Sequence, residues 1–178
     1  MNSISEVIHG HVSTDLLKDD GRFPNNEHLP LLIYKGVLRL HPDDEPDCIL
    51  ALFEKNGWSN GWKNGIYDYH HYHSNTHEVL GIFCGTAELQ LGGPSGTCVE
   101  LDRGDVIVIP AGVAHKCLKP SNDFLCTGAY PEGRDYDINQ GRDGERPLAD
   151  ERIKNVPIPH LDPVFGTEGP LTQHWKQT

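Results

Sequence analysis

The sequence predicts an all-β fold, because short segments rich in β-branched and aromatic residues follow one another at close spacing through the middle of the chain. Turn residues separate these segments, and the chain has 19 Gly and 13 Pro, which is many for a helical protein. So many short strands favour a closed barrel or a sandwich. The predicted strands are 67–73, 78–84, 86–91, 97–101, 105–109, 115–118 and 124–130.

The length of 178 residues predicts one domain over residues 1–178 with a single core. Residues 1–30 are polar and show no sustained periodicity, so we expect an N-terminal arm there. Residues 131–178 are rich in Gly, Pro, Asp and Arg, which predicts an irregular C-terminal arm over the barrel. The barrel core is expected over residues 31–130.

One short helix is expected near residues 46–56. Pro46 suits its first turn, Gly57 would end it, and either Asp44 or Asp47 could cap it. Its apolar stripe would consist of Ile49, Leu52 and Phe53.

The segments around this helix have weaker patterns. Residues 31–34 and 37–40 are short β-type runs, each of which could join a sheet edge. Residues 58–65 combine Trp, Asn and Gly, which predicts a polar loop.

Charge and composition exclude several classes of partner. The chain has 26 acidic and 15 basic side chains, and the net charge of -11 repels nucleic acid and anionic membrane surfaces. No apolar run approaches the roughly 20 residues that a membrane span needs. The first 18 residues lack the basic start and apolar core of a signal peptide. We therefore expect a cytoplasmic protein with neither a nucleic-acid nor a membrane partner.

The cysteines are scattered singly, with no C-x-x-C pair and no dense disulfide framework. We expect free thiols in a reducing compartment, and none is assigned as a nucleophile. They are Cys48, Cys84, Cys98, Cys117 and Cys126.

A histidine-rich segment carries the first chemical signal. Side chains two apart in a strand point the same way, so His71 and His73 can both face the interior of a barrel. Glu78 begins the returning strand, where its carboxylate could meet the two imidazoles. Two imidazole nitrogens and one carboxylate oxygen suit a divalent first-row metal.

A second segment, residues 104–115, would supply a fourth ligand from a distant part of the chain. Its β-branched strand ends at a turn containing Pro110 and Gly112, which can aim His115 back toward the barrel. The alternative is that these histidines are hydrogen-bonded core or surface groups and that Glu78 is only the partner in a buried salt bridge.

Together the two segments resemble the conserved motifs of the cupin superfamily. The first motif is matched at every position, by Gly65, His71, His73, Glu78 and Gly85. The second is matched by Gly104, Pro110, Gly112 and His115, whereas Lys119 stands where the family has Asn. More narrowly, residues 71–78 and 144–147 are similar to the YjlB-type group of small cupins.

The resemblance implies a double-stranded β-helix, the jelly-roll barrel of the RmlC-like cupins, with one divalent metal ion per chain. The implied metal ligands are His71, His73, Glu78 and His115. Fe, Ni, Zn, Mn and Co all accept this ligand set.

Other residues near the motifs have two open interpretations. His70 and His77 are expected to lie behind the ligands or on the surface. Cys117 is either a pocket residue or an ordinary buried cysteine. Tyr67 and Tyr69 could line the pocket, although aromatic core packing is the expectation. For residues 134–136 we expect a solvated loop and not a substrate clamp.

Two classes of function follow from the metal site. The first is a metal-dependent enzyme, a dioxygenase or an isomerase, acting on a small organic molecule, with no identifiable catalytic residue beyond the ligands. The second is a non-catalytic cupin module that binds a small molecule or a metal, because the fold alone cannot decide. A homodimer is expected, formed through sheet edges near Leu31 and Val37.

Overall fold

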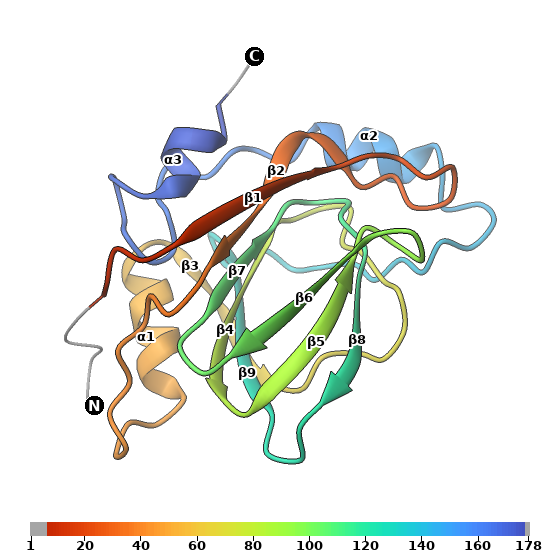
Figure 1. Ribbon diagram of the computed structural model, residues 1–178. Coiled ribbons are helices and arrows are strands. Elements are labelled where there is room, and N and C mark those ends of the chain that lie inside the picture. Colours follow the sequence, from red (N-terminus) through yellow and green to blue (C-terminus); the bar gives the residue numbers. More distant parts are fainter. Residues whose placement is uncertain (1–6, 177–178) are drawn as a thin grey trace.

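The computed structural model describes residues 7–176, which form nine strands and three helices (Figure 1). The strands are β1 (Val12–Leu17), β2 (Asn26–Tyr34), β3 (Trp58–Asn64), β4 (Glu78–Cys84), β5 (Thr86–Leu91), β6 (Thr97–Asp102), β7 (Val106–Ile109), β8 (His115–Pro120) and β9 (Leu125–Pro131).

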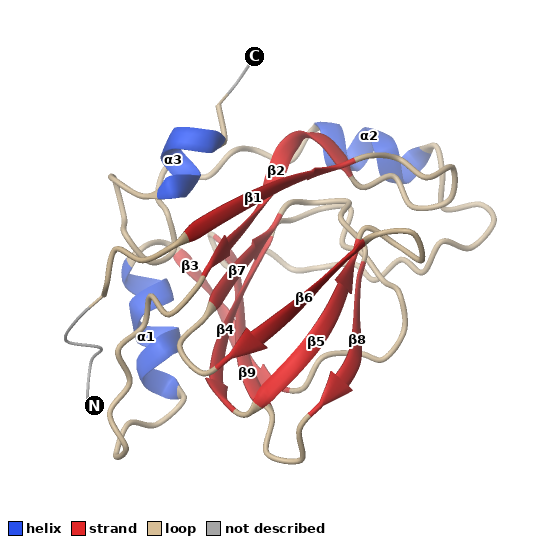
Figure 2. Ribbon diagram, in the orientation of Figure 1, coloured by secondary structure: helices blue, strands red, loops and turns tan. Residues whose placement is uncertain are grey.

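Two antiparallel sheets face each other across the core (Figure 2). The larger sheet has the strand order β1-β2-β7-β4-β9-β3, and the smaller one has the order β6-β5-β8. The predicted all-β jelly-roll barrel is therefore confirmed.

Strand β4 is buried on both faces, and its alternation decides what enters the barrel. Leu80 and Ile82 point into the core between the sheets, whereas Val79 packs in the cluster on the other face, beneath the first helix. Glu78 shares the parity of Leu80 and Ile82, so its side chain also faces the barrel interior.

The helix predicted near residues 46–56 is confirmed as α1 (Asp47–Lys55). Its predicted cap is wrong, because Pro46 occupies the N-cap position and no side chain caps the helix. The Asp44 carboxylate instead accepts a hydrogen bond from the backbone N–H of His41. Gly57 follows the helix with φ of +83°, a conformation that glycine adopts without strain.

The strands predicted from Glu78 onward are confirmed to within two residues at each end. The predicted strand 67–73 is wrong, because this segment contributes two isolated bridges, His71 to His115 and Tyr72 to Asn139. Nor do residues 37–40 form a strand; Leu38 makes one bridge, to Val7. Neither segment runs alongside a strand for long enough to form a continuous series of inter-strand hydrogen bonds.

The polar loop predicted for residues 58–65 is wrong, because β3 lies there and pairs antiparallel with β9. Residues 58–64 show no clean alternation of apolar and polar side chains. β3 is an edge strand, and most of its side chains are partly or fully exposed. The ladder with β9 supplies the order that the local pattern does not indicate.

The N-terminal arm is also more ordered than predicted. Residues 1–6 lie outside the described residues, but β1 and the start of β2 lie inside the predicted arm, where β1 pairs with β2. Because β2 is paired on both sides, with β1 and β7, the run near Leu31 offers no free edge for a dimer. Val37 is fully buried and belongs to no strand, so it offers no edge either. The free edge at this end of the sheet is that of β1.

The C-terminal arm contains two helices that were not predicted, α2 (Leu148–Lys154) and α3 (Pro170–His174). Both are too short for a clear periodic pattern, and tertiary contacts hold them. Asp162 anchors the arm, because its buried carboxylate accepts hydrogen bonds from the Tyr34 hydroxyl at 2.6 Å and from the backbone N–H of Val164 and Leu171. Spanning a bilayer would require a longer and more apolar helix than any in residues 7–176.

His77 joins this arm to the barrel. Its Nδ1 accepts a hydrogen bond from the backbone N–H of Ala111 at 2.8 Å, and its Nε2 lies 3.2 Å from the carbonyl oxygen of Pro157. The ring of Trp175 packs against it at a centroid distance of 4.7 Å. Burial lowers the pKa of His77 to about 3, so the ring is held neutral.

We predict that His77 makes the fold acid-sensitive. The unfolded chain takes up a proton at His77 below the ordinary pKa of 6.5 and the folded chain only near 3, so stability falls as the pH falls through this window. Replacing His77→Gln should reduce the slope of the unfolding free energy against pH by up to about 1.4 kcal/mol per pH unit. Urea denaturation at several pH values measures the slope, and parallel curves for the two proteins would contradict the prediction.

Candidate metal centre

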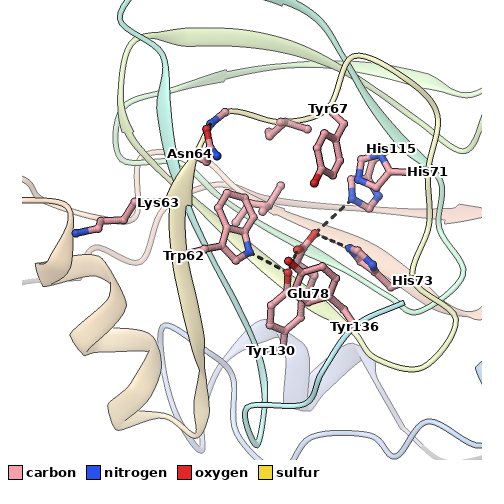
Figure 3. A pocket seen from close by; sticks show the side chains of 13 residues that line it. Trp62, Lys63, Asn64, Tyr67, His71, His73, Glu78, His115, Tyr130 and Tyr136 are labelled. Carbon is pink, nitrogen blue, oxygen red and sulfur yellow. Dashed lines mark hydrogen bonds and ion pairs between the residues drawn. The ribbon is translucent and has the colours of Figure 1, made fainter. Parts of the chain in front are cut away.

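A pocket of about 160 Å³ opens into the barrel, and its lining includes all four residues predicted as metal ligands (Figure 3). His71, His73, Glu78 and His115 are each at most 5% exposed. The structure therefore brings together two parts of the chain that are far apart in sequence, as the two motifs predicted.

His71 and His115 are direct neighbours across an antiparallel bridge. The backbone N–H of His71 donates to the carbonyl of His115 at 3.2 Å, and that of His115 donates back at 2.9 Å. Residues that exchange both hydrogen bonds project their side chains to the same side. The two rings accordingly lie with their centroids 4.0 Å apart.

His73 is placed by the turn that precedes His115. Its carbonyl accepts a hydrogen bond from the backbone N–H of Gly112 at 2.8 Å, inside the predicted Pro-x-Gly turn. Gly112 has φ of +93°, and a Cβ there would come within 2.4 Å of the carbonyl oxygen of Asn25. The turn therefore requires glycine, and through it the second motif positions a histidine of the first.

All three imidazoles have their Nδ1 engaged with a backbone carbonyl. For His71 the partner is Tyr69 at 3.0 Å, for His115 it is Val113 at 3.0 Å, and for His73 it is Asp137 at 2.6 Å. A carbonyl only accepts, so each Nδ1 carries the proton and each Nε2 is left to face the pocket.

The ring nitrogens form a tight cluster, in which the nearest donor atoms of His71, His73 and His115 lie within 4.8 Å of one another. Glu78 adjoins two of them, because its Oε1 lies 3.5 Å from Nε2 of His73 and 3.3 Å from Nε2 of His115.

The other oxygen of Glu78 is held by residues that sequence analysis missed. The Tyr130 hydroxyl donates to Oε2 at 2.7 Å, and the indole N–H of Trp62 donates to the Tyr130 hydroxyl at 2.9 Å (Figure 3). The Tyr130 hydroxyl therefore satisfies Oε2, and Oε1 is the oxygen directed at the imidazoles.

The pKa values reflect this arrangement. Burial alone would raise the pKa of Glu78, but the neighbouring His73 and His115 outweigh burial and hold it well below its usual range. Burial opposes a charge on His73, yet Glu78 and the Asp137 carbonyl raise its pKa. His71 differs, because burial and the adjacent His115 lower its pKa to about 3.

The donor set fits a divalent first-row metal ion. Three neutral imidazole nitrogens and one carboxylate oxygen face a common space, and their second atoms are fixed by hydrogen bonds to carbonyls and to a tyrosine. Such supporting hydrogen bonds orient metal ligands in proteins and raise their basicity.

The pocket walls correct several predictions. Tyr67 lines the pocket and is 49% exposed, so the expected core packing is wrong for it. Tyr136, predicted to lie in a solvated loop, also lines the pocket and stacks on Tyr130 at a centroid distance of 4.8 Å. The residues around Tyr136 in the sequence are those of an ordinary polar loop. Tyr136 reaches the pocket because the C-terminal arm folds back against the barrel.

The remaining neighbours lie outside the pocket lining. Cys117 is buried in the core between the sheets, as an ordinary cysteine. His70 is half-buried and packs against Phe23, and its buried Nδ1 has no hydrogen-bond partner among the described residues. His77 is a buried structural group. All five cysteines are free, as predicted.

We predict that Tyr130→Phe lowers the unfolding free energy by about 1–3 kcal/mol, because it leaves a buried carboxylate oxygen and a part-buried indole N–H without a partner. The control is Tyr69→Phe, which removes a hydroxyl outside the hydrogen-bond chain of Trp62, Tyr130 and Glu78 and should change stability by less than about 0.5 kcal/mol. Chemical denaturation measures both, and equal effects of the two substitutions would count against this hydrogen-bond chain.

No family model matches the chain. Among solved structures, WlaRA, a TDP-fucose-3,4-ketoisomerase from Campylobacter jejuni, is 16% identical with a TM-score of 0.41, over 60% of this chain and 87% of that chain. An acireductone dioxygenase from Bacillus anthracis, with a cadmium ion in its active centre, is 18% identical with a TM-score of 0.38, over 49% of this chain and 59% of that chain.

A protein of Bacillus subtilis (strain 168), the uncharacterized protein YjlB, is 43% identical over 164 residues. The match covers 91% of this chain and 95% of YjlB, so it includes the barrel and both arms. The motif spacing, the observed jelly roll and this extensive identity agree, and the chain belongs to the YjlB family of cupins.

Proposed function

We propose that this protein is a metal-dependent enzyme that binds one divalent ion on His71, His73, Glu78 and His115 and acts on a small organic molecule. The observation that carries the proposal is the common orientation of the imidazoles. Each Nδ1 is tied to a carbonyl, so the Nε2 atoms converge, beside a carboxylate oxygen, on one pocket.

When bound, the ion would supply Lewis acidity or a site for O2, which is the chemistry of an isomerase or of a dioxygenase. Four protein ligands leave positions open on an ion that prefers six, and Fe, Ni, Zn, Mn and Co all accept these ligands. The protein's own residues would fix the ligand atoms and limit the access of water, since the four side chains are buried at the base of an open pocket.

The alternative is a non-catalytic module that binds a metal or a small molecule. A sealed apolar cavity would favour it, whereas this pocket is open and contains a polar, histidine-lined region that a substrate could reach. We therefore place the enzyme first.

We predict that protein purified without chelator contains about one divalent ion per chain. His73→Ala and His115→Ala should each weaken binding by more than the roughly 10- to 100-fold that loss of a supporting hydrogen bond costs. His160→Ala, which removes an exposed histidine, is the matched control and should keep the ion. Elemental analysis and metal titration measure this, and metal-free wild-type protein that takes up no added ion would refute the site.

The reaction class is tested next. Oxygen uptake with a diketone, thiol or catechol, abolished by His73→Ala, would assign a dioxygenase. Turnover of such compounds without oxygen uptake would assign an isomerase. Stoichiometric metal with ligand binding and no turnover would favour the non-catalytic module.

The quaternary structure and location are proposals of the same kind. We propose a homodimer through the free edge of β1, where Leu16 is 48% exposed. Size-exclusion chromatography with light scattering at micromolar concentration should give twice the mass of the chain, and a monomer would contradict it. The free cysteines support a cytoplasmic location.

A further inference from the structure

The walls of the pocket around the imidazoles are aromatic and fixed in place. Tyr130 and Tyr136 stack with a centroid distance of 4.8 Å and an interplanar angle of 22°. Tyr67, on the other side in Figure 3, is braced by Tyr69 at 4.9 Å and 19°. Each wall residue therefore has a second ring behind or beside it that limits its rotation.

Trp62 is held as firmly. Its indole lies directly against the backbone of β9, because a Cβ at Gly128 would come within 2.2 Å of the ring. The indole N–H is committed to the Tyr130 hydroxyl at 2.9 Å. The pocket thus presents preformed flat surfaces.

The same walls offer no cationic partner for an anionic group away from the imidazoles. Lys63 is the one lysine or arginine among the described residues that line the pocket. Its Nζ lies 2.8 Å from Asp47 Oδ1 of α1, and Figure 3 shows the side chain directed away from the pocket. A phosphate or a remote carboxylate on a ligand would therefore lose its hydration without gaining a counter-charge.

The volume of the pocket is close to that of a single six-membered ring. A dry cavity of about 150 Å³ holds a benzene molecule, and this pocket measures about 160 Å³.

We propose that the substrate is a small, flat, uncharged ring compound, aromatic or conjugated, whose metal-binding oxygens lie at one end. This inference rests on the proposed function, because the metal would receive those oxygens. The ring would lie between Trp62 and the tyrosines, with Tyr136 as a specificity-determining residue.

The test compares three hydroxamates on zinc-loaded protein by calorimetry. Acetohydroxamate, benzohydroxamate and cyclohexanecarbohydroxamate present the same metal-binding group and differ only in what fills the pocket. We expect benzohydroxamate to bind at least about tenfold more tightly than acetohydroxamate, because it buries a ring. It should also bind more tightly than the cyclohexyl compound, which is puckered.

Two variants of Tyr136 test whether this residue causes the preference for benzohydroxamate. Tyr136→Leu keeps an apolar side chain but removes the flat surface, and should reduce the advantage of benzohydroxamate by about three- to tenfold. Tyr136→Phe keeps the ring and should preserve the advantage. Because Tyr136 is 42% exposed, neither substitution disturbs the core, and elemental analysis checks the zinc content of each.

The outcomes separate the two proposals. If zinc binds but the three hydroxamates have affinities within about threefold of one another, the ring inference is overturned and the metal site stands. Unchanged selectivity in Tyr136→Leu would likewise overturn the assignment of Tyr136. If zinc does not bind at all, the proposed function fails, and elemental analysis shows this before any hydroxamate is added.

Discussion

The buried carboxylate of Glu78 is the constraint on which the site depends. A charge in the barrel interior is costly unless each of its oxygens has a partner. Here the Tyr130 hydroxyl satisfies Oε2, whereas Oε1 faces the unprotonated Nε2 atoms of His73 and His115, so a cation bound among them would be its partner. The parity of β4, set by Leu80 and its neighbours in the core, leaves Glu78 no other direction in which to point.

Around this carboxylate the histidines are oriented by backbone and not by other side chains. His71 and His115 each bind a carbonyl two residues earlier in the chain, so their orientation is local. His73 depends instead on the carbonyl of Asp137, which lies in the C-terminal arm. The Asp137 carboxylate accepts the backbone N–H of Ser74 at 2.7 Å, which holds the arm in place. The arm is thus part of the site.

Much of this structure could be predicted from sequence, where the signal was local. The strands from Glu78 onward follow from alternation and turn residues, and α1 follows from its apolar stripe. The convergence of His71 and His115 follows from the motif resemblance, because no local pattern joins residues so far apart. The bridge that pairs them shows why the two motifs occur together.

What could not be predicted depends on tertiary contacts. Strands β1 and β3 are edge strands with mixed composition, and their partners β2 and β9 supply the order. Tyr130 lies near the end of β9, and nothing nearby in the sequence indicates that its hydroxyl meets Glu78. The exposed fraction of a loop tyrosine such as Tyr136 depends on the path of the whole arm.

The charge distribution also limits the chemistry that this pocket supports. Catalysis by a pair of carboxylates, as in glycoside hydrolysis, needs a second acidic group facing the first across the substrate. Among the described residues that line the pocket, Glu78 is the one acidic side chain, and its Oε2 is committed to the Tyr130 hydroxyl. Under the proposed function, a reaction here would rely on polarisation of substrate oxygens by a metal ion at the histidine cluster. That chemistry agrees with the proposed ring-shaped substrate, which the aromatic walls would contact without offering it a charge.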